Sequence, residues 1–319
     1  MNILLTGAGG VYIKHLIDKL NREVLFKEIT IVDSDFKSIK NIKTDYKYKV
    51  PLGTSSSFLS TILKIIKKRN INVVVSVVDE ELVKFLTIRK KLFLLQPNIH
   101  FSKICLNKYH LGQKLFKYKI NKFQTFSLKE YKNNFNFPII VKPIFGRGSR
   151  NVSRIKNFDQ FKKIINKIKD KEKYIVQKIV KGDEYTVSVL VNEKSNDYQI
   201  VPKKIIKKER YTRKAITEEN HLIKKTCINI IKRFKPGGPF NVQCIANRKY
   251  VEIFEINPRL STSSTLTDAA GINEINILVT NKFIKTLSLK KITWKKGVKL
   301  IRTNKDNFSY EKKSSKLDR

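Results

Sequence analysis

Three short apolar segments, separated by stretches with helical periodicity, place the strongest constraint on the fold of this chain. They span residues 2–6, 28–32 and 73–78, and residues 58–69 repeat apolar side chains at helical spacing. Strands that alternate with helices form right-handed βαβ units around a parallel sheet. Residues 1–105 are therefore predicted to form a small doubly wound domain.

Small and acidic residues follow the first and third of these strands. Gly7-Ala8-Gly9-Gly10 is similar to the start of the dinucleotide fingerprint G-x-G-x-x-G, but the chain has Tyr12 where the third glycine is required. A tight strand-to-helix turn is therefore favoured, although Asp33 lies at a suitable distance for a ribose. Residues 79–81, Asp-Glu-Glu, stand where parallel sheets bind ligands, or else they cap the next helix.

The remaining chain mixes strands and helices and shows no internal repeat. Strands are predicted over 137–142, 174–178, 184–191, 198–206 and 298–302, and helices over 107–118, 157–169, 215–234 and 272–284. The Lys- and Ser-rich end of the chain, residues 306–319, has the composition of a disordered tail.

The net charge of +40 raises the question of a nucleic-acid partner. The basic residues are spread from Lys14 to Lys316 and form no long block, whereas a nucleic-acid footprint clusters on one face or helix. We therefore favour a basic composition on all solvated faces over a nucleic-acid partner. Such a field would still attract small anions such as nucleotides.

The start of the chain and its cysteines indicate the compartment. The opening MNILLTGAGG has no basic region, so we expect no secretory signal, and the longest apolar run is too short to cross a membrane. Cys105, Cys227 and Cys244 lack metal or redox spacing and are predicted to be buried small hydrophobes. A reducing cytoplasm is the simplest setting.

Residues 240–259, FNVQCIANRKYVEIFEINPR, read as two strands joined by a tight turn. Side chains alternate along a strand, so Glu255 and Asn257 share one face and Phe254 and Ile256 point to a core. A carboxylate and an amide at the end of an apolar strand form an oxygen-rich patch. Mg²⁺ takes oxygen ligands of this kind, usually together with substrate phosphates.

Gln243 can join this patch only if the strand register allows it. A two-residue loop would place Gln243 opposite Glu252, on the wrong face. A loop of three residues, or a bulge, would place it opposite Ile253 and beside Glu255. We predict the three-residue loop.

A second polar stretch, residues 144–150, follows the strand that ends at Lys142. It contains two glycines, a serine and two arginines within five residues, which predicts a mobile, cationic hairpin tip. Glycine lets backbone N–H groups approach a phosphate closely, and Lys142 would add a point charge. The alternative is a plain glycine turn.

Taken together, these segments resemble the ATP-grasp superfamily, in its branch similar to the carbamoyl-phosphate synthase large subunit. The resemblance is carried by Asn107-Lys108, FPIIVKPIFGRGSR (137–150), YIVQKIVKGDEYTVSVL (174–190) and residues 240–259, with the opening ten residues in support. It implies an α/β chain in which a Rossmann-like domain (1–105) precedes the two α+β lobes that sandwich ATP (106–190 and 191–305).

The resemblance also implies roles for individual residues. ATP would be bound by Lys108, Lys142, Gly146, Arg147, Gly148, Ser149, the hinge residues Gln177, Lys178 and Ile179, and Glu184 at the ribose. Mg²⁺, or alternatively Mn²⁺, would be coordinated by Gln243, Glu255 and Asn257. Arg259 would steady the transferred phosphoryl group, and Arg150 would bind the substrate.

Two features stay open within this resemblance. Hinge position 178 is commonly acidic in relatives and is Lys178 here, so a side-chain contact to the adenine amino group would be lost. The basic segment 201–213 carries six Lys and Arg residues, and the sequence does not say which of them faces the site.

The chemistry that the resemblance implies is ATP-dependent ligation. A carboxylate would be activated as an acyl phosphate and then attacked by an amine or another nucleophile. The partners would be small molecules, with no membrane and with a homodimer as an option. Two alternatives are a nucleic-acid-binding protein on a degenerate ATP-grasp scaffold and a Rossmann-type oxidoreductase. Specificity is expected in the strand ends of the first domain and in residues 200–220 and 260–275.

Overall fold

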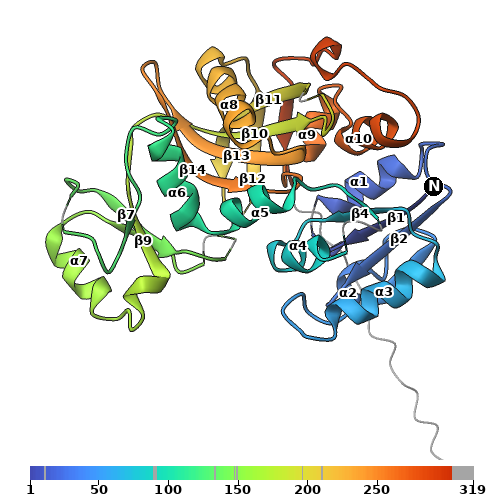
Figure 1. Cartoon of the computed structure of the whole chain (residues 1–319), viewed down its shortest axis with the longest axis horizontal. Helices are drawn as coiled ribbons and strands as arrows, with labels where there is room; N and C mark the ends of the chain where they lie inside the picture. Colours follow the sequence, from blue (N-terminus) through green and yellow to red (C-terminus); the bar gives the residue numbers. More distant parts are fainter. Residues whose placement is uncertain are drawn as a thin grey trace, which may run out of the picture.

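The computed structural model describes residues 1–303 except 11, 89–91, 133, 147, 149, 196 and 210. Its strands form three sheets, of five, four and six strands. The N-terminal domain lies at one end of the molecule and a small lobe at the other, with a larger lobe between them (Figure 1). The α/β fold predicted from the sequence is confirmed, whereas the predicted tail, 306–319, lies outside the described residues.

The N-terminal domain contains a parallel sheet of order β3-β2-β1-β4-β5. Its strands are β1 (Asn2–Thr6), β2 (Glu28–Asp33), β3 (Tyr46–Lys49), β4 (Val73–Ser76) and β5 (Phe93–Leu94), and its helices are α1 (Ile13–Leu20), α2 (Phe36–Ile39), α3 (Phe58–Lys68) and α4 (Asp79–Leu86). The turn after β1 requires glycine. Gly7 has φ +64°, and a Cβ there would lie 2.4 Å from the side chain of Val78.

The small lobe is built on an antiparallel sheet of order β6-β9-β7-β8. Its elements are β6 (Phe126–Ser127), β7 (Ile139–Pro143), β8 (Ser153–Ile155), α7 (Phe158–Ile165), the 3₁₀ turn Lys171–Lys173 and β9 (Tyr174–Lys178). Ile139, Val141, Phe161 and Val176 form a core of its own. The lobe connects to the rest of the chain through residues 118–125 and 179–182.

The larger lobe is an antiparallel sheet of order β14-β13-β10-β11-β12-β15. Its strands are β10 (Asp183–Val191), β11 (Tyr198–Lys208), β12 (Thr212–Thr217), β13 (Gly238–Ala246), β14 (Val251–Asn257) and β15 (Lys299–Ile301). The helices are α5 (Ile99–Leu106), α6 (Lys108–Lys117), α8 (His221–Phe234), α9 (Ser264–Ala269) and α10 (Glu274–Phe283), with a 3₁₀ turn at Leu289–Lys291. None of the helices in the described ranges is long and apolar enough to cross a membrane.

Two predicted elements of this lobe differ from the structure. The helix predicted over 215–234 begins only at His221, where the side chain of Asn220 caps it, and β12 precedes it. Within TRKAIT (212–217), Ala215 and Thr217 are buried while Lys214 and Ile216 are not, which is the two-residue period of a strand. The Ser- and Thr-rich stretch after residue 260 also contains the short helix α9, which the sequence did not indicate.

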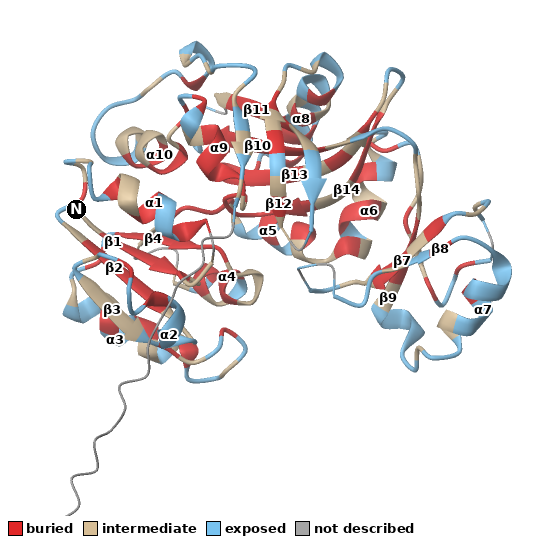
Figure 2. Cartoon of the chain, turned by 180° about the vertical axis from the view of Figure 1, so that it is seen from behind, coloured by how far each residue is buried: buried red, intermediate tan, exposed pale blue. Residues whose placement is uncertain are grey.

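The N-terminal domain and the larger lobe share one hydrophobic core. Ile13 and Ile17 of α1 belong to the same buried cluster as Ile275 and Val279 of α10. Two polar contacts reinforce the junction: Lys19 pairs with Asp268, and the amide of Asn273 donates to Glu23 at 2.8 Å. The buried residues in Figure 2 accordingly run from the sheet of the first domain into the larger lobe, whereas the small lobe is set apart.

Candidate active site

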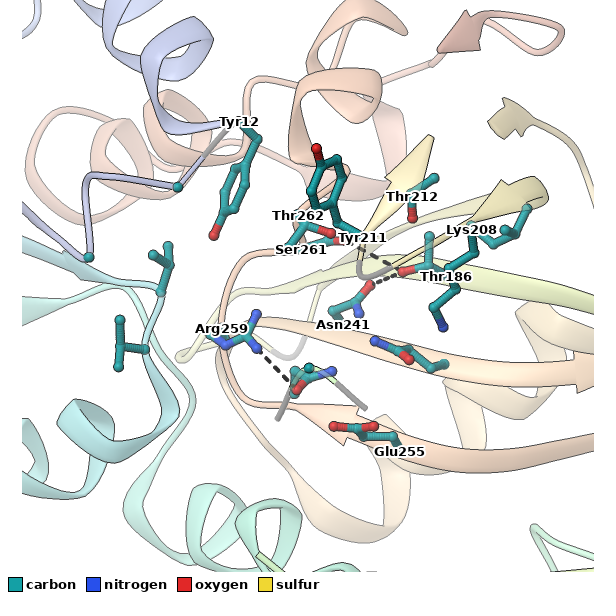
Figure 3. A pocket seen from close by; sticks show the side chains of 18 of the residues that line it. Tyr12, Thr186, Lys208, Tyr211, Thr212, Asn241, Glu255, Arg259, Ser261 and Thr262 are labelled. Atoms are coloured by element: carbon teal, nitrogen blue, oxygen red, sulfur yellow. Dashed lines mark hydrogen bonds between the residues drawn. The ribbon is translucent and has the colours of Figure 1, made fainter. Parts of the chain in front are cut away.

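A cavity of about 380 Å³ opens where the N-terminal domain, the larger lobe and the glycine-rich loop of the small lobe meet. Residues from all three parts line it: Gly7, Gly9, Gly10, Tyr12, Val77, Val78, Gly148, Arg150, Glu184, Thr186, Ile205, Lys208, Tyr211, Thr212, Asn241, Gln243, Glu255, Asn257, Arg259, Ser261, Thr262 and Arg302. In Figure 3, Tyr12 enters from the first domain, Glu255 lies at the opposite side, and Arg259 lies between them.

The hairpin of β13 and β14 brings its predicted polar residues onto one face. Gln243 pairs directly with Glu255, and Asn241 pairs with Asn257. The predicted three-residue loop is wrong, because residues 247–250 form a four-residue connection. The alternative, a bulge, is what the structure contains: Phe254 has no partner opposite it, and this extra residue restores the register that places Gln243 beside Glu255.

Phe254 does not enter the core as predicted, because the bulge turns its side chain away from the hydrophobic cluster. It is half-buried, and the ammonium groups of Lys142 and Lys208 lie 5.6 and 5.7 Å from its ring centroid. Ile256 does belong to the core. Phe254 thus provides an aromatic face under two cations, which is a favourable cation–π arrangement.

Lys142 reaches this face from β7 of the small lobe. Its ammonium donates to the carbonyl of Phe254 at 2.9 Å, so it connects the small lobe to the hairpin. The pKa of Lys142 is lowered to about 8, chiefly by burial; the charge of Glu255 opposes this shift, and the neighbouring cations Lys108 and Lys208 contribute to it. A bound anion would restore the ordinary pKa of such a lysine, so the site is prepared for negative charge.

Lys108 begins α6, which Asn107 caps by accepting a hydrogen bond from the N–H of His110. The ammonium of Lys108 donates to the carbonyl of Gly146 at 2.6 Å and lies 4.0 Å from Glu255. Lys108 therefore joins the glycine-rich loop to the hairpin carboxylate.

The glycine-rich loop stands over the cavity with two glycines in the left-handed region. Gly146 has φ +115° and Gly148 has φ +68°, and an added Cβ at either would meet open space. Gly148 and Arg150 line the cavity. The other two predicted residues of the loop, Arg147 and Ser149, lie outside the described residues.

The predicted hinge, Gln177 to Ile179, covers the last two residues of β9 and the residue after it. The amide nitrogen of Gln177 donates to Thr125 at 3.0 Å, while its buried Oε1 has no hydrogen-bond partner among the described residues. A buried acceptor of this kind fits a donor such as an adenine amino group. The ammonium of Lys178 donates to the carbonyl of Asn136 at 3.3 Å, and the N–H of Ile179 donates to that of Pro138 at 3.3 Å.

The basic segment 201–213 divides into residues that face the cavity and residues that do not. Lys208 lines the cavity and pairs with Glu184, the predicted ribose ligand. Lys203 does not line the cavity. It is fully buried, and its ammonium donates to the hydroxyls of Ser188 and Thr267 at 2.7 Å each. Among the described lysines of this segment, Lys208 is thus the one that reaches the cavity. Strand alternation alone could not show this, because the pairing of β11 with β12 contains register shifts.

Arg259 is fixed from two sides. Its Nε donates to Asp79 of the N-terminal domain at 2.6 Å, and its Nη2 donates to Asn257 at 3.3 Å. Asp79 lies in the first turn of α4, so this member of the acidic stretch 79–81 orients an arginine at the cavity. Glu81 is buried and accepts from the hydroxyls of Thr6 and Ser76, away from the cavity.

Several residues of the cavity carried no signal in the sequence that we used. Tyr12, read only as a missing glycine, is a wall residue, and Arg302, at the end of the predicted strand 298–302, is another. Tyr211, Ser261 and Thr262 fall in the segments where specificity is expected.

Two polar side chains attach the connection between the larger lobe and the small lobe to β14. One is Asn121, in the connection itself, and the other is Glu252, in β14. Asn121 exchanges two hydrogen bonds with the backbone of Ile253, at 2.7 and 3.0 Å. The carboxylate of Glu252 accepts from the N–H groups of Lys122 and Phe123, at 3.0 and 3.4 Å. Both contacts attach the connection formed by residues 118–125 to β14.

We expect Glu252→Ala to lower the free energy of unfolding by about 1–3 kcal/mol, because two partly buried N–H groups, those of Lys122 and Phe123, lose their acceptor. Burial raises the pKa of Glu252 to about 7. Between the unfolded pKa of about 4.3 and this value the folded chain binds more protons, so stability should fall as pH rises through that window. Urea denaturation at pH 5 and pH 7.5 should show this fall in the wild type and a weaker one in Glu252→Gln. The exposed Glu219→Gln is the control, and an unchanged slope in Glu252→Gln would contradict the assignment.

Comparison with known proteins agrees with the geometry. Residues 105–263 match the family model of the ATP-grasp domain. The sequence has no significant match among curated proteins. The structure, in contrast, is similar to many solved structures, and these define its fold as the ATP-grasp fold with a preceding parallel-sheet domain.

Three of these structures illustrate the similarity. The biotin carboxylase domain dimer of 2-oxoglutarate carboxylase from Hydrogenobacter thermophilus, in complex with MgADP, ADP and bicarbonate, has a TM-score of 0.73 at 13% identity, covering 92% of this chain and 72% of that chain. An L-amino acid ligase from Bacillus licheniformis has a TM-score of 0.71 at 13% identity, covering 92% and 77%. N5-carboxyaminoimidazole ribonucleotide synthetase from Thermotoga maritima has a TM-score of 0.67 at 16% identity, covering 90% and 78%.

Proposed function

We propose that this protein is an ATP-dependent ligase that activates a carboxylate as an acyl phosphate and transfers the acyl group to an amine or another nucleophile. The observation that carries the proposal is the shared face of Gln243, Glu255 and Asn257 beneath Lys108 and Lys142. Oxygen donors that line a cavity, with two cations beside them at the hairpin, suit a metal-bound triphosphate. Within the superfamily, the four ordered segments favour the branch of the carbamoyl-phosphate synthase large subunit.

The donor set fits a hard divalent cation. Glu255 offers a carboxylate, and Gln243 and Asn257 offer amide oxygens from adjacent strands, all lining the cavity. Mg²⁺ binds oxygen ligands of this type and neutralises phosphate charge when it is bound. Mn²⁺ has similar ligand preferences and is the alternative.

The nucleotide would be bound by residues from both lobes. Gln177 would accept from the adenine amino group with its free Oε1, and Glu184 would bind the ribose. Lys108 and Lys142 would bind the phosphates, and the glycine-rich loop would cover them and exclude water. Two hydrogen bonds within the protein, from Lys108 to the carbonyl of Gly146 and from Lys142 to the carbonyl of Phe254, already join the two lobes. Closure of the lobes around the nucleotide would therefore require little rearrangement.

The reaction would proceed in two steps. A carboxylate oxygen of the substrate attacks the γ-phosphorus of ATP, the bond to the β–γ bridging oxygen breaks, and ADP leaves. The nucleophile then attacks the carbonyl carbon, releasing phosphate and a proton. Arg259, oriented by Asp79, would stabilise the transferred phosphoryl group in both steps. The three buried free cysteines support a cytoplasmic setting for this chemistry.

The test is ATP turnover that depends on a carboxylic acid. Purified protein with Mg²⁺-ATP is screened against carboxylic acids, with ADP release as the readout and hydroxylamine present to trap an acyl phosphate as a hydroxamate. We expect ADP and hydroxamate to form in equal amounts with the correct acid. ADP release without any dependence on an acid, or no binding of Mg²⁺-ATP, would refute the proposal. RNA or DNA binding that falls steeply with salt would instead favour the nucleic-acid alternative.

A further inference from the structure

Arg302 is a half-buried arginine at the cavity whose charge has no acidic partner among the described residues. It follows β15 and lines the cavity. Its Nη1 donates to the carbonyl of Thr212 at 2.7 Å and its Nη2 donates to that of Thr262 at 3.0 Å. Both acceptors are neutral, so these bonds hold the side chain in place without compensating its charge.

Two other cations of the cavity differ from Arg302 in this respect, and Arg150, the remaining described cation of the lining, is exposed to solvent. Arg259 is paired with Asp79, and Lys208 is paired with Glu184. Burial lowers the pKa of Arg302, which means that the protein environment disfavours its charge. A charged group that is partly removed from water without a counter-ion is costly unless a ligand supplies one.

The surroundings of Arg302 are rich in hydroxyl groups. Thr212 and Thr262, whose carbonyls it contacts, lie together with Ser261, Tyr211 and Tyr12 on the side of the cavity opposite Glu255 (Figure 3). The ring centroid of Tyr211 lies 5.7 Å from the guanidinium carbon. Hydroxyl donors around a fixed guanidinium are suited to bind the oxygens of an anion.

The cavity contains no described carboxylate at this side. Its two acidic lining residues, Glu184 and Glu255, lie with the nucleotide and metal residues, and the ammonium group of a substrate would find no counter-ion near Arg302. The volume of about 380 Å³ must also hold part of the nucleotide, so the acid that remains is small.

We propose that the substrate acid carries a second anionic group, a carboxylate or a phosphate, which Arg302 binds while the carboxylate to be activated lies toward Arg259. This inference rests on the proposed function and adds the substrate class: a small dianionic acid. Arg302 would position the acid through its far end and would not touch the transferred phosphoryl group. A purely structural role is the competing explanation, since the bonds to Thr212 and Thr262 also attach β15 to its neighbours.

Binding of matched acids to the protein with Mg²⁺ and a non-hydrolysable ATP analogue separates these explanations. The probes are succinate against butyrate and phosphoglycolate against glycolate, measured by calorimetry. We expect at least one dianion to bind at least about tenfold more tightly than its matched monoanion, as one added charge-assisted contact predicts. The pair that discriminates identifies the second group as carboxylate or phosphate. Equal affinities within both pairs, or no binding of either dianion, overturn the inference.

Variants of Arg302 test whether this residue binds the second anionic group. Arg302→Gln, which can still donate to a carbonyl, should lower the affinity for the preferred dianion by about 30-fold or more and leave the affinity for its matched monoanion unchanged. Arg302→Lys should weaken it about tenfold, because lysine lacks the planar fork. The control Arg233→Gln removes an exposed arginine and the same unit of net charge, and should change nothing.

The outcomes also separate this inference from the proposed function. If the ATP analogue does not bind, the proposed function fails. If the analogue binds and the discrimination between dianion and monoanion persists in Arg302→Gln, only the present inference fails. Should Arg302→Gln not fold, an unchanged dianion affinity in Arg302→Lys overturns the inference.

Discussion

Replacing Glu255 by alanine should reduce Mg²⁺-dependent ATP turnover by about 100- to 1,000-fold. Glu255 is the carboxylate on the face that it shares with Gln243 and Asn257, and those two residues are neutral. Without it the face presents only amide oxygens and the nearby cations Lys108 and Lys142. A divalent cation would then meet net repulsion where it now meets attraction.

The measurement is ADP release as a function of Mg²⁺ concentration, with nucleotide binding measured in parallel. Glu255→Asp should recover part of the activity at higher Mg²⁺, because the charge is kept and only the reach is shorter. Glu172→Ala, which removes an exposed carboxylate of the small lobe, is the matched control. Normal Mg²⁺-ATP binding by the double variant Glu255→Ala, Asn257→Ala would exclude the assigned metal face.

The affinity for ATP should fall as pH rises above about 8, and this fall should disappear in Lys142→Arg. The pKa of Lys142 is lowered to about 8, so the fraction that is protonated decreases above that pH. An anion binds the protonated form, and a single titrating group predicts a loss approaching about tenfold per pH unit once the lysine is mainly neutral. Arginine stays charged over this range, which removes the titration.

Equilibrium binding of an ATP analogue between pH 7 and pH 10 provides the measurement. Lys142→Met should bind weakly at every pH, with the largest difference from the wild type at pH 7, where the native lysine is charged. Lys129→Met removes an exposed lysine of the same lobe and should retain the wild-type profile. A profile in Lys142→Arg that still falls above pH 8 would assign the titration to another group.

The strands and most helices could be predicted because their apolar patterns are local. The predicted bounds of residues 2–6 and 174–178 agree with the structure, since each segment contains a short apolar run with β-branched residues that begins next to a polar residue. The helix predicted from residue 215 failed because TRKAIT mixes lysine and alanine with β-branched residues. Its extended conformation depends on pairing with β11 and β15, which are distant partners for local propensity to indicate.

The polar face that Gln243, Glu255 and Asn257 share illustrates how far the sequence alone can go. The alternation of side chains along one strand predicts that Glu255 and Asn257 share a face. This prediction requires no knowledge of how that strand pairs with its neighbour. For Gln243, which lies on the other strand, the register between β13 and β14 had to be known. The one-residue offset that places Gln243 beside Glu255 comes from the bulge at Phe254 and not from the loop. Nothing in the local sequence distinguishes these two solutions, since either supplies the single residue of offset.

The substrate side of the cavity could not be predicted, because its residues come from segments with no common pattern. Tyr12, Tyr211 and Arg302 are brought together by three different connections of the chain. Arg302 in particular ends a three-residue edge strand, where an exposed surface arginine would be the ordinary expectation. Only the pairing of β15 with β12 turns it toward the cavity.

The ion pair between Arg259 and Asp79 makes the two halves of this enzyme interdependent. The arginine belongs to the ATP-grasp domain, but the carboxylate that aims it is supplied from outside that domain, across the shared core of α1 and α10. A chain shortened to the ATP-grasp lobes would therefore lose the carboxylate that orients Arg259, together with the part of the shared core that α1 supplies. We therefore expect the first domain and the lobes to change in sequence as a matched pair at this junction, because the ion pair and the packing of α1 against α10 both depend on residues from the two sides.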